Sequence, residues 1–498
     1  MITKLFGPPG SGKTTYLLET VAKELEAGTH SVDIGYFAFT RKAAFEARDR
    51  AIEKFPHLNA DTDFPWFRTL HSLAYGCLGV ESKDIMSAKD YAKFAKSVGL
   101  DVATSTDGDD FVVRADNAIL NEINIARIKG EDLRTHYNRS SIDIEWYHFE
   151  YVERSYRKFK EAKMLMDFTD LLEQIVEQPE RLPTLQALII DEAQDLSKLQ
   201  WKLVMQLANK AQRTWIAGDD DQAVYVWAGA DVESFLSCDG DVHVLNQSYR
   251  VPSKIHSFAD KIVRRIQQRQ PKEWSPRTDG GEISYYNDFQ QVDISSGQWL
   301  IMAATNYMLN DMHEWIKSQG LLFERHGHKS VSEAMLSAVI GWERLRAGRD
   351  INYAMLKNVY RYLGVGMVAR GHRTLKEAEP EDMFSIEDLK EKHGLLTDAI
   401  WHEALGKIGE DKRDYLVAVL RRGTKLTAKA PIQLSTIHGA KGGEADNVLL
   451  MTDLSPRFAK EYEYNADSIH RLLYVGVTRT RQALHIVLPK NGERGFRF

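Results

Sequence analysis

Cysteine is scarce in this 498-residue chain, because only Cys77 and Cys238 occur and no CxxC pair or Cys/His cluster accompanies them. Zinc and iron–sulfur sites are built from such clusters, so the sequence predicts neither, and we expect two free thiols in a reducing cytoplasm. The chain also lacks an apolar run of the roughly 18 residues that span a membrane, and its N-terminus lacks a signal pattern. We therefore expect a cytoplasmic protein with no membrane partner.

Positive charge is not in excess either, since 65 Lys and Arg residues face 71 Asp and Glu residues, for a formal net charge of −6. This balance neither announces a nucleic-acid-binding protein nor excludes one, because a local basic channel matters more than the total. Hydrophobic content of 43% and charged content of 27% are ordinary for a globular protein. The length predicts three or four domains of about 100–200 residues each.

What the sequence does contain is a complete phosphate-binding loop near its start. Residues 7–14 read GPPGSGKT, which matches GxxxxGK[ST], between a strand-like apolar stretch and a helical pattern. The glycines let backbone N–H groups point inward at an anion, Lys13 can reach the β- and γ-phosphates, and the Thr14 hydroxyl can ligate Mg²⁺. The sequence therefore predicts a nucleoside triphosphate site with these residues: Gly7, Pro8, Pro9, Gly10, Ser11, Gly12, Lys13, Thr14 and Thr15.

Short β-branched strands alternate with helices along the chain, which is typical of a parallel α/β fold. The expected strands are 32–39, 187–190, 214–217, 242–245, 300–303, 433–436, 448–451 and 484–488. Several of them end directly in a polar motif, as expected where ligand sites lie at the carboxyl ends of strands. Two charged, helix-patterned stretches, about 76–165 and 331–424, interrupt the alternation as insertions would.

A pair of carboxylates follows the apolar strand 187–190. Asp191 is placed to hold Mg²⁺, directly or through water, and Glu192 to orient and deprotonate the attacking water. An Asp-Glu pair is often only the start of a helix. The phosphate loop upstream favours the catalytic interpretation.

A third strand leads into Asp219, Asp220, Asp221 and Gln222. Three consecutive aspartates are unfavourable at close range unless some of them cap backbone, bind cations or face water. Gln222 is an uncharged donor and acceptor suited to sensing a γ-phosphate. Tyr225 and Trp227 lie two residues apart, so both rings would point the same way in an extended segment and form a stacking platform for bases. Packing in the core is the more common role for such a pair.

With these motifs, the chain resembles the UvrD/Rep-type superfamily 1 DNA helicases. The other matching segments follow in family order, and together the motifs span residues 7 to 479. They are AFTRKAA (38–44), TLHSLA (69–74), MDFTDLL (166–172), LNQSYR (245–250), LSTIHGAKGGE (434–444) and YVGVTR (474–479).

The resemblance implies roles for the matching positions. Lys13, Thr14 and Asp191 would hold ATP and Mg²⁺, and Glu192 would be the base for water. Gln222 would couple the γ-phosphate to movements on the DNA side. Arg250 and Arg479 would neutralise the transition state, Tyr249 would stack on adenine, and Glu444 would contact the ribose. The residues expected to contact DNA are Phe39, Thr40, Arg41, His71, Tyr225, Trp227 and His438, although His71 and His438 are as readily explained as packed histidines.

The resemblance also implies two RecA-like α/β motor domains, each with a mainly helical insertion. The expected ranges are 1–75 with 166–245 for motor 1A, 76–165 for insertion 1B, 246–330 with 425–498 for motor 2A, and 331–424 for insertion 2B. ATP would bind in the cleft of the motors, and single-stranded DNA would cross both. The implied activity is 3′→5′ movement on single-stranded DNA and separation of tailed duplex DNA. A translocase that displaces bound proteins with little unwinding is the alternative.

Three departures from the family pattern are visible. Arg41 replaces the usual Asn, which adds a cation for a backbone phosphate, and Ala228 replaces the usual Arg. Only six residues precede Gly7, so we expect no upstream glutamine element to read adenine and a looser nucleotide selectivity.

Overall fold

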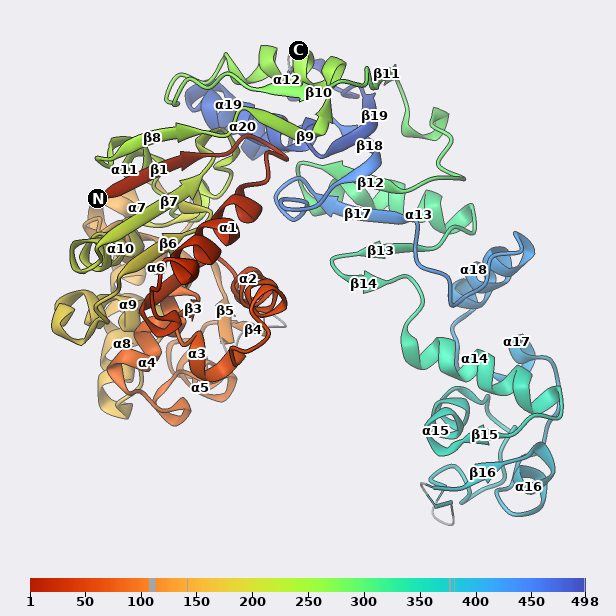
Figure 1. Cartoon of the computed structure of the whole chain (residues 1–498). Helices are drawn as coiled ribbons and strands as arrows, with labels where there is room; N and C mark the ends of the chain where they lie inside the picture. Colours follow the sequence, from red (N-terminus) through yellow and green to blue (C-terminus); the bar gives the residue numbers. More distant parts are fainter. Residues whose placement is uncertain (107–112, 141, 376–377, 380, 497) are drawn as a thin grey trace. The chain divides into compact units, whose positions relative to one another are not determined.

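The computed structural model describes residues 1–106, 113–140, 142–375, 378–379, 381–496 and 498 (Figure 1). The chain divides into two compact units, Met1–Gly280 with Glu461–Thr478, and Gly281–Lys460 with Arg479–Phe498. Residues 246–280 and 461–478 thus pack with the first unit, whereas their expected place was motor 2A. The functional domain boundaries stay a prediction.

The first unit is built on a six-stranded sheet in which every neighbouring pair is parallel. Its order is β3–β2–β6–β7–β1–β8. The strands are β1 (Ile2–Phe6), β2 (Ile34–Phe37), β3 (Phe67–Arg68), β6 (Ala187–Ile190), β7 (Arg213–Gly218) and β8 (Asp241–Val244). All four residues of β6 are buried, as expected for a parallel strand covered on both faces.

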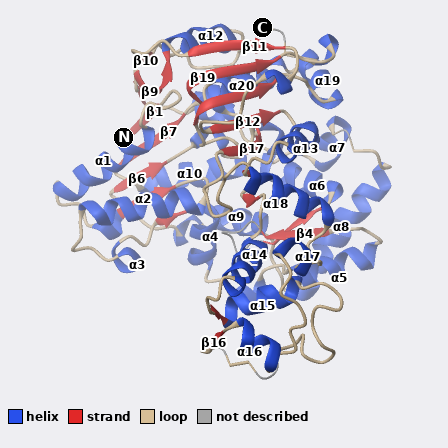
Figure 2. Ribbon diagram, turned by 90° about the vertical axis from the view of Figure 1, so that its right-hand side faces the viewer, coloured by secondary structure: helices blue, strands red, loops and turns tan. Residues whose placement is uncertain are grey.

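Helices cover both faces of this sheet (Figure 2). Along β6, Leu188 and Ile190 enter one hydrophobic cluster and Ala187 and Ile189 another, because successive side chains of a strand point to opposite faces. The helices of the unit outside its insertion are α1 (Lys13–Glu26), α2 (Arg41–Lys54), α3 (Ala60–Asp63), α4 (Leu70–Leu78), α9 (Phe168–Glu177), α10 (Lys198–Lys210), α11 (Val232–Ser237), α12 (Ser253–Val263) and α20 (Ala466–Val477).

The stretch between α4 and α9 is mainly helical and has a hydrophobic cluster of its own, which includes Phe94, Ile123 and Phe149. Its elements are α5 (Ala88–Val98), the antiparallel pair β4 (Ala103–Thr106) and β5 (Val113–Asp116), α6 (Ala118–Lys129), α7 (Leu133–Arg139) and α8 (Trp146–Lys163).

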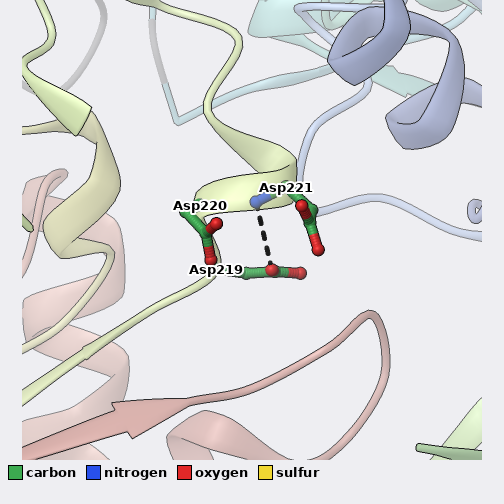
Figure 3. A group of neighbouring side chains, drawn as sticks. All are labelled: Asp219, Asp220 and Asp221. Carbon is green, nitrogen blue, oxygen red and sulfur yellow. Dashed lines mark hydrogen bonds between the residues drawn. The ribbon is translucent and has the colours of Figure 1, made fainter. Parts of the chain in front are cut away.

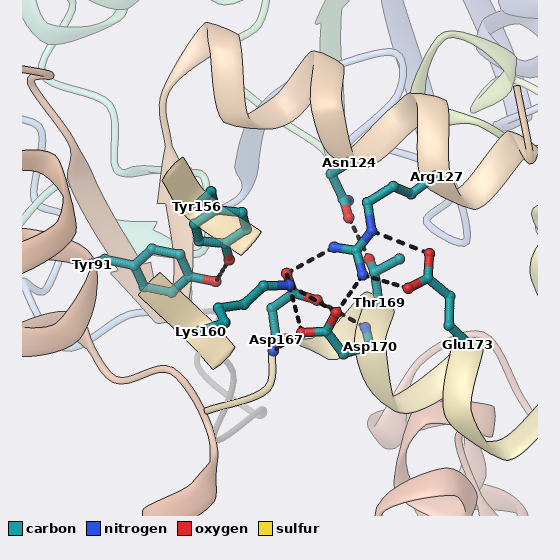
Figure 4. A network of polar contacts seen from close by, with 9 residues as sticks. All are labelled: Tyr91, Asn124, Arg127, Tyr156, Lys160, Asp167, Thr169, Asp170 and Glu173. Atoms are coloured by element: carbon teal, nitrogen blue, oxygen red, sulfur yellow. Dashed lines mark hydrogen bonds and ion pairs between the residues drawn. The ribbon is translucent and has the colours of Figure 1, made fainter. Parts of the chain in front are cut away.

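A partly buried ion network ties this stretch to α9 (Figure 4). The Arg127 guanidinium of α6 lies 2.9 Å from Asp167 Oδ2 and 2.6 Å from Glu173 Oε2. The Lys160 ammonium of α8 lies 2.7 Å from Asp167 Oδ2 and 2.6 Å from Asp170 Oδ2. Burial alone would raise the pKa of Asp167, but the charges of Arg127 and Lys160 lower it below its ordinary value. Asp167 also caps α9 by accepting from the Asp170 N–H. One carboxylate therefore joins three helices.

The second unit contains a seven-stranded sheet in the order β11–β19–β18–β12–β17–β13–β14, in which every neighbouring pair is parallel except the antiparallel pair of β13 and β14. Its strands are β11 (Glu282–Tyr286), β12 (Trp299–Ala303), β13 (Phe323–Arg325), β14 (His328–Lys329), β17 (Ile432–Thr436), β18 (Ala445–Met451) and β19 (Thr480–Val487). Trp299, Ile301, Trp342 and Leu416 belong to one continuous core that joins this sheet to helices.

The remaining elements are mostly helices. They are α13 (Asn310–Ser318), α14 (Glu333–Arg346), β15 (Ile351–Asn352), α15 (Tyr353–Tyr362), β16 (Met383–Phe384), α16 (Ile386–Glu391), α17 (Trp401–Ala404), α18 (Glu410–Arg421) and α19 (Pro456–Tyr464). Among the described residues, no helix combines the length and apolarity that crossing a membrane requires. Cys77 and Cys238 are free thiols, as expected. The predicted α/β class with two parallel sheets is confirmed.

Candidate active site

The polar motifs of the first unit follow three neighbouring strands. β1, β7 and β6 lie side by side and parallel, and they end in the phosphate loop, in Asp219–Gln222 and in Asp191-Glu192 respectively. The carboxyl ends of parallel strands meet at one edge of a sheet. The topology therefore brings together groups that lie about 180 residues apart in the sequence.

The phosphate loop needs its glycines for conformation and space. Gly10 and Gly12 have φ values of 70° and 79°, in the left-handed region that favours glycine. A Cβ on Gly7 would lie 1.9 Å from Lys13 Cγ, so the stem of Lys13 folds over the space that Gly7 leaves. Ser11 Oγ is buried without a hydrogen-bond partner among the described residues. Such a hydroxyl, beside the start of α1, fits a phosphate oxygen.

Lys13 meets the two carboxylates at the end of β6. Its ammonium lies 3.3 Å from Glu192 Oε1. Burial would lower the pKa of Lys13, but the charges of Glu192, Asp191 and Asp219 outweigh burial and raise it. Burial, followed by the charge of Glu192, raises the pKa of Asp191 to about 6. Tyr36 donates to Asp191 Oδ2 at 2.9 Å and so fixes the direction of that carboxylate. Thr14, the other expected ligand of Mg²⁺, is partly buried in the first turn of α1, and Thr15 beside it is exposed.

Glu192 is held by its backbone and by Gln194. Its φ of 54° lies in the left-handed region, which is strained for a residue with a side chain. The Gln194 amide donates to Glu192 Oε2 at 2.5 Å, and Gln194 Oε1 accepts from the Asp219 N–H at 2.8 Å. Gln194 is fully buried and bridges the motifs that follow β6 and β7. It lies two residues from the expected base, yet the sequence reasoning gave it no role.

The three aspartates after β7 are buried rather than solvated (Figure 3). Asp219 caps the short helix η5 (Asp220–Gln222) by accepting from the Asp221 N–H, and its Oδ2 accepts from the Gln222 amide at 2.6 Å. The counter-charges are Lys272 and Arg269, which the sequence reasoning missed. The sequence held one indication of such cations, because three consecutive aspartates need positive charges nearby if they are buried.

The segment that carries Tyr249 and Arg250 lies against the phosphate loop, within the first unit. It forms β9 (Gln247–Pro252), which pairs with β10 (Ser275–Arg277). Ser248 Oγ donates to the Pro9 carbonyl at 2.7 Å, and the Tyr249 N–H donates to the Gly10 carbonyl at 2.9 Å. A Cβ on Gly10 would lie 2.3 Å from Arg250 Cβ. The Tyr249 side chain is exposed.

The expected site residues of the second unit lie next to three strands: His438 follows β17, Glu444 precedes β18 and Arg479 precedes β19. Arg479 is 1% exposed, and its Nη1 lies 3.4 Å from the Gly443 carbonyl oxygen. Glu444 forms an ion pair of 3.0 Å with Arg481, a residue that the sequence reasoning missed. The His438 ring stacks on Phe458 with centroids 6.0 Å apart. This contact is what a packed histidine would make.

Among the residues expected to contact DNA in the first unit, Phe39 follows β2, and Tyr225 and Trp227 follow η5. The Phe39 and Tyr225 rings stack with centroids 5.8 Å apart and an angle of 17°. Trp227 is 49% exposed. The expectation of an extended segment is wrong, because Val226–Ala228 form the 3-10 helix η6, so alternation along a strand does not orient Tyr225 and Trp227.

Thr40, Arg41 and His71 each have a local contact. Thr40 caps α2 by accepting from the Ala43 N–H at 3.2 Å. The Arg41 guanidinium lies over the Phe45 ring at 5.3 Å from its centroid. The His71 ring meets the edge of Phe168 with centroids 5.9 Å apart. Thr40 is the N-cap and Arg41 the first residue of α2, which follows Phe39.

The strand–loop–helix element, Lys13 and the carboxylates at the end of β6 define a phosphate-binding site of the P-loop class. Two family models match the chain: the UvrD/REP helicase N-terminal domain at residues 3–243 and the UvrD-like helicase C-terminal domain at residues 404–491. Together they cover about two thirds of the chain. The chain belongs to the UvrD/Rep helicase family, and its two parallel sheets correspond to the RecA-like motors of that family.

Curated relatives agree with this assignment. The protein named ATP-dependent DNA helicase PcrA of Bacillus subtilis is 27% identical over 388 residues, which are 72% of this chain and 50% of that protein. The protein of the same name from Staphylococcus epidermidis is 28% identical over 310 residues, which are 57% of this chain and 41% of that protein. The chain thus spans half or less of the length of these relatives.

Proposed function

We propose that this protein is an ATP-dependent DNA helicase that moves along single-stranded DNA and separates tailed duplex DNA, driven by Mg²⁺-dependent ATP hydrolysis. Lys13, Asp191 and Glu192 converge at the ends of neighbouring strands, and this convergence carries the proposal. The PcrA relatives are named ATP-dependent DNA helicases, which supports the choice of ATP and DNA. The 3′→5′ direction follows from the family resemblance.

On the nucleotide side, the loop N–H groups, Ser11 and Lys13 bind phosphates, and Thr14 and Asp191 hold the metal. Bound Mg²⁺ would supply positive charge to the phosphates. Glu192 takes a proton from the attacking water. Its backbone conformation and the hydrogen bond from Gln194 hold its carboxylate in position for this step.

The remaining nucleotide contacts come from other segments. Gln222 senses the γ-phosphate, and Arg250 and Arg479 neutralise charge that develops in the transition state. Tyr249 stacks on the base, because its exposed side chain leaves room for one. Glu444 contacts the ribose.

On the DNA side, Phe39, Tyr225 and Trp227 offer rings on which bases stack, a contact that tolerates any sequence. Thr40 and Arg41 contact the backbone near the start of α2. His71 and His438 are the further proposed contacts, and each already packs against a phenylalanine.

The test is ATP hydrolysis with and without single-stranded DNA, on the whole chain and on Glu192→Gln as the matched inactive control. We expect DNA to stimulate hydrolysis by the wild type and not by the variant. Hydrolysis that ignores DNA would contradict the proposal. A tailed-duplex unwinding assay should run beside a protein-displacement assay, because displacement without unwinding would identify a translocase instead.

A further inference from the structure

Three consecutive carboxylates are enclosed beside the γ-phosphate sensor. Asp219 and Asp220 are 0% exposed and Asp221 is 1% exposed (Figure 3). Their oxygens lie close enough together for one small cation to reach all three. Burial, together with the neighbouring carboxylates, raises the pKa of Asp220 to about 6 although Lys272 lowers it. An enclosed cluster of this kind is unfavourable unless cations neutralise it.

The cation is the ammonium of Lys272, a residue outside the motifs. It lies 3.2 Å from Asp219 Oδ1 and 2.9 Å from Asp221 Oδ2, and it also pairs with Asp220. Its side chain is 1% exposed. Arg269 adds a bidentate pair with Asp221 at 2.8 and 2.7 Å. Lys272 and Arg269 therefore set two positive charges against the three carboxylates, so groups of the protein itself supply most of the counter-charge.

These contacts continue directly to Gln222. Asp219 holds Lys272 with one oxygen and the Gln222 amide with the other, at 2.6 Å. The chain that carries Lys272 also binds η5, since the Gln270 N–H donates to Asp220 Oδ2 at 2.8 Å. Arg471 of α20 donates to the Asp220 carbonyl at 2.9 Å and to the Gln268 carbonyl at 2.5 Å. Two other segments, the chain that carries Lys272 and α20, therefore fix the position of one short helix.

We propose that Lys272 is a positioning residue for nucleotide hydrolysis, which holds Gln222 in place through Asp219. The proposal rests on the proposed function, in which Gln222 senses the γ-phosphate. Lys272 acts through Asp219 and Gln222 rather than on the nucleotide, so its loss should lower kcat and leave nucleotide affinity, which depends on Lys13 and the loop, little changed. A small misplacement of a reacting group can reduce a rate by about 10²-fold.

The experiment compares Lys272→Met, which removes the charge and keeps most of the volume, with Lys261→Met on the exposed face of α12 as the control. Kinetics are measured with single-stranded DNA at a temperature at which each variant is folded. We expect kcat to fall by about 10²-fold with KM for ATP nearly unchanged in Lys272→Met, and no effect in the control. Wild-type hydrolysis measured in parallel tests the proposed function separately.

Two further variants distinguish positioning from stability. Asp220→Asn with Lys272→Met removes one charge of each sign, so the melting temperature should recover while kcat stays low. Recovery of kcat with the melting temperature would overturn the proposal. In a Gln222→Ala background, Lys272→Met should cause little additional loss of kcat, because both changes remove the same interaction. Additive losses would show that Lys272 does not act through Gln222.

Discussion

At the residue scale, backbone strain and a hydrogen bond from Gln194 hold Glu192, the proposed base, in place. Replacing Glu192 by Gln keeps the shape of the side chain and an oxygen that can accept from Lys13, but removes the carboxylate that accepts a proton. We expect Glu192→Gln to bind nucleotide normally and to lose about 10²–10⁴-fold in hydrolysis. Unchanged turnover would remove Glu192 from the mechanism. Lys13→Ala is the matched comparison, because it should weaken nucleotide binding as well as turnover.

The pKa of about 6 at Asp191 predicts a pH dependence of magnesium binding. A proton and the proposed Mg²⁺ would compete for this carboxylate, which a pKa of about 6 leaves charged above that pH and protonated below it. The affinity for Mg²⁺ with a non-hydrolysable ATP analogue should therefore be constant above pH 7 and fall about tenfold per pH unit below pH 6. Calorimetry at pH 7 and pH 5 measures this difference. Asp191→Asn should bind Mg²⁺ weakly and without this pH response, and an equal wild-type affinity at both pH values would contradict the assignment.

At the scale of elements, the ion network of α6, α8 and α9 predicts that Lys160 is a structural residue. Lys160→Met would leave the buried Asp167 and the partly buried Asp170 with only Arg127 as counter-charge. Breaking a buried pair in this way costs about 3–5 kcal/mol of the free energy of unfolding. Urea denaturation measures the loss, and Lys158→Met, exposed on the same helix, is the control. Equal stability of both variants would mean that the network contributes little.

Trp227 is placed on η6 as an exposed ring, which favours a base-stacking role over a core role. Trp227→Ala should weaken single-stranded DNA binding by about 1–3 kcal/mol, or about 5- to 150-fold, with little change in melting temperature. Trp201 is 3% exposed, so Trp201→Ala is the matched core control and should cost about 3–5 kcal/mol of stability. A destabilised Trp227→Ala protein with normal DNA affinity per folded molecule would show that this ring is packing.

At the scale of the whole molecule, the sequence predicted the α/β class, most strand positions and the family, because the phosphate loop and alternating strands are local patterns. It could not predict Gln194, Lys272 or Arg269. Their contacts depend on which strands are neighbours and on which side chains are buried together, and one sequence does not contain that information. The geometry expected for Tyr225 and Trp227 failed for the opposite reason, since a local turn replaced the extended segment.

The net charge of −6 predicts that DNA binding depends on a few local cations rather than on the field of the whole molecule. Each phosphate contact contributes about 0.7 to the slope of log affinity against log salt for single strands. Arg41→Ala should therefore lower this slope by about 0.7. Trp227→Ala should lower the affinity for DNA and leave the slope unchanged. Arg50→Ala is the control, because Arg50 lies on the same helix and pairs with Glu46. Fluorescence titrations at several salt concentrations measure the slopes, and equal slopes for wild type and Arg41→Ala would show that Arg41 does not contact a phosphate.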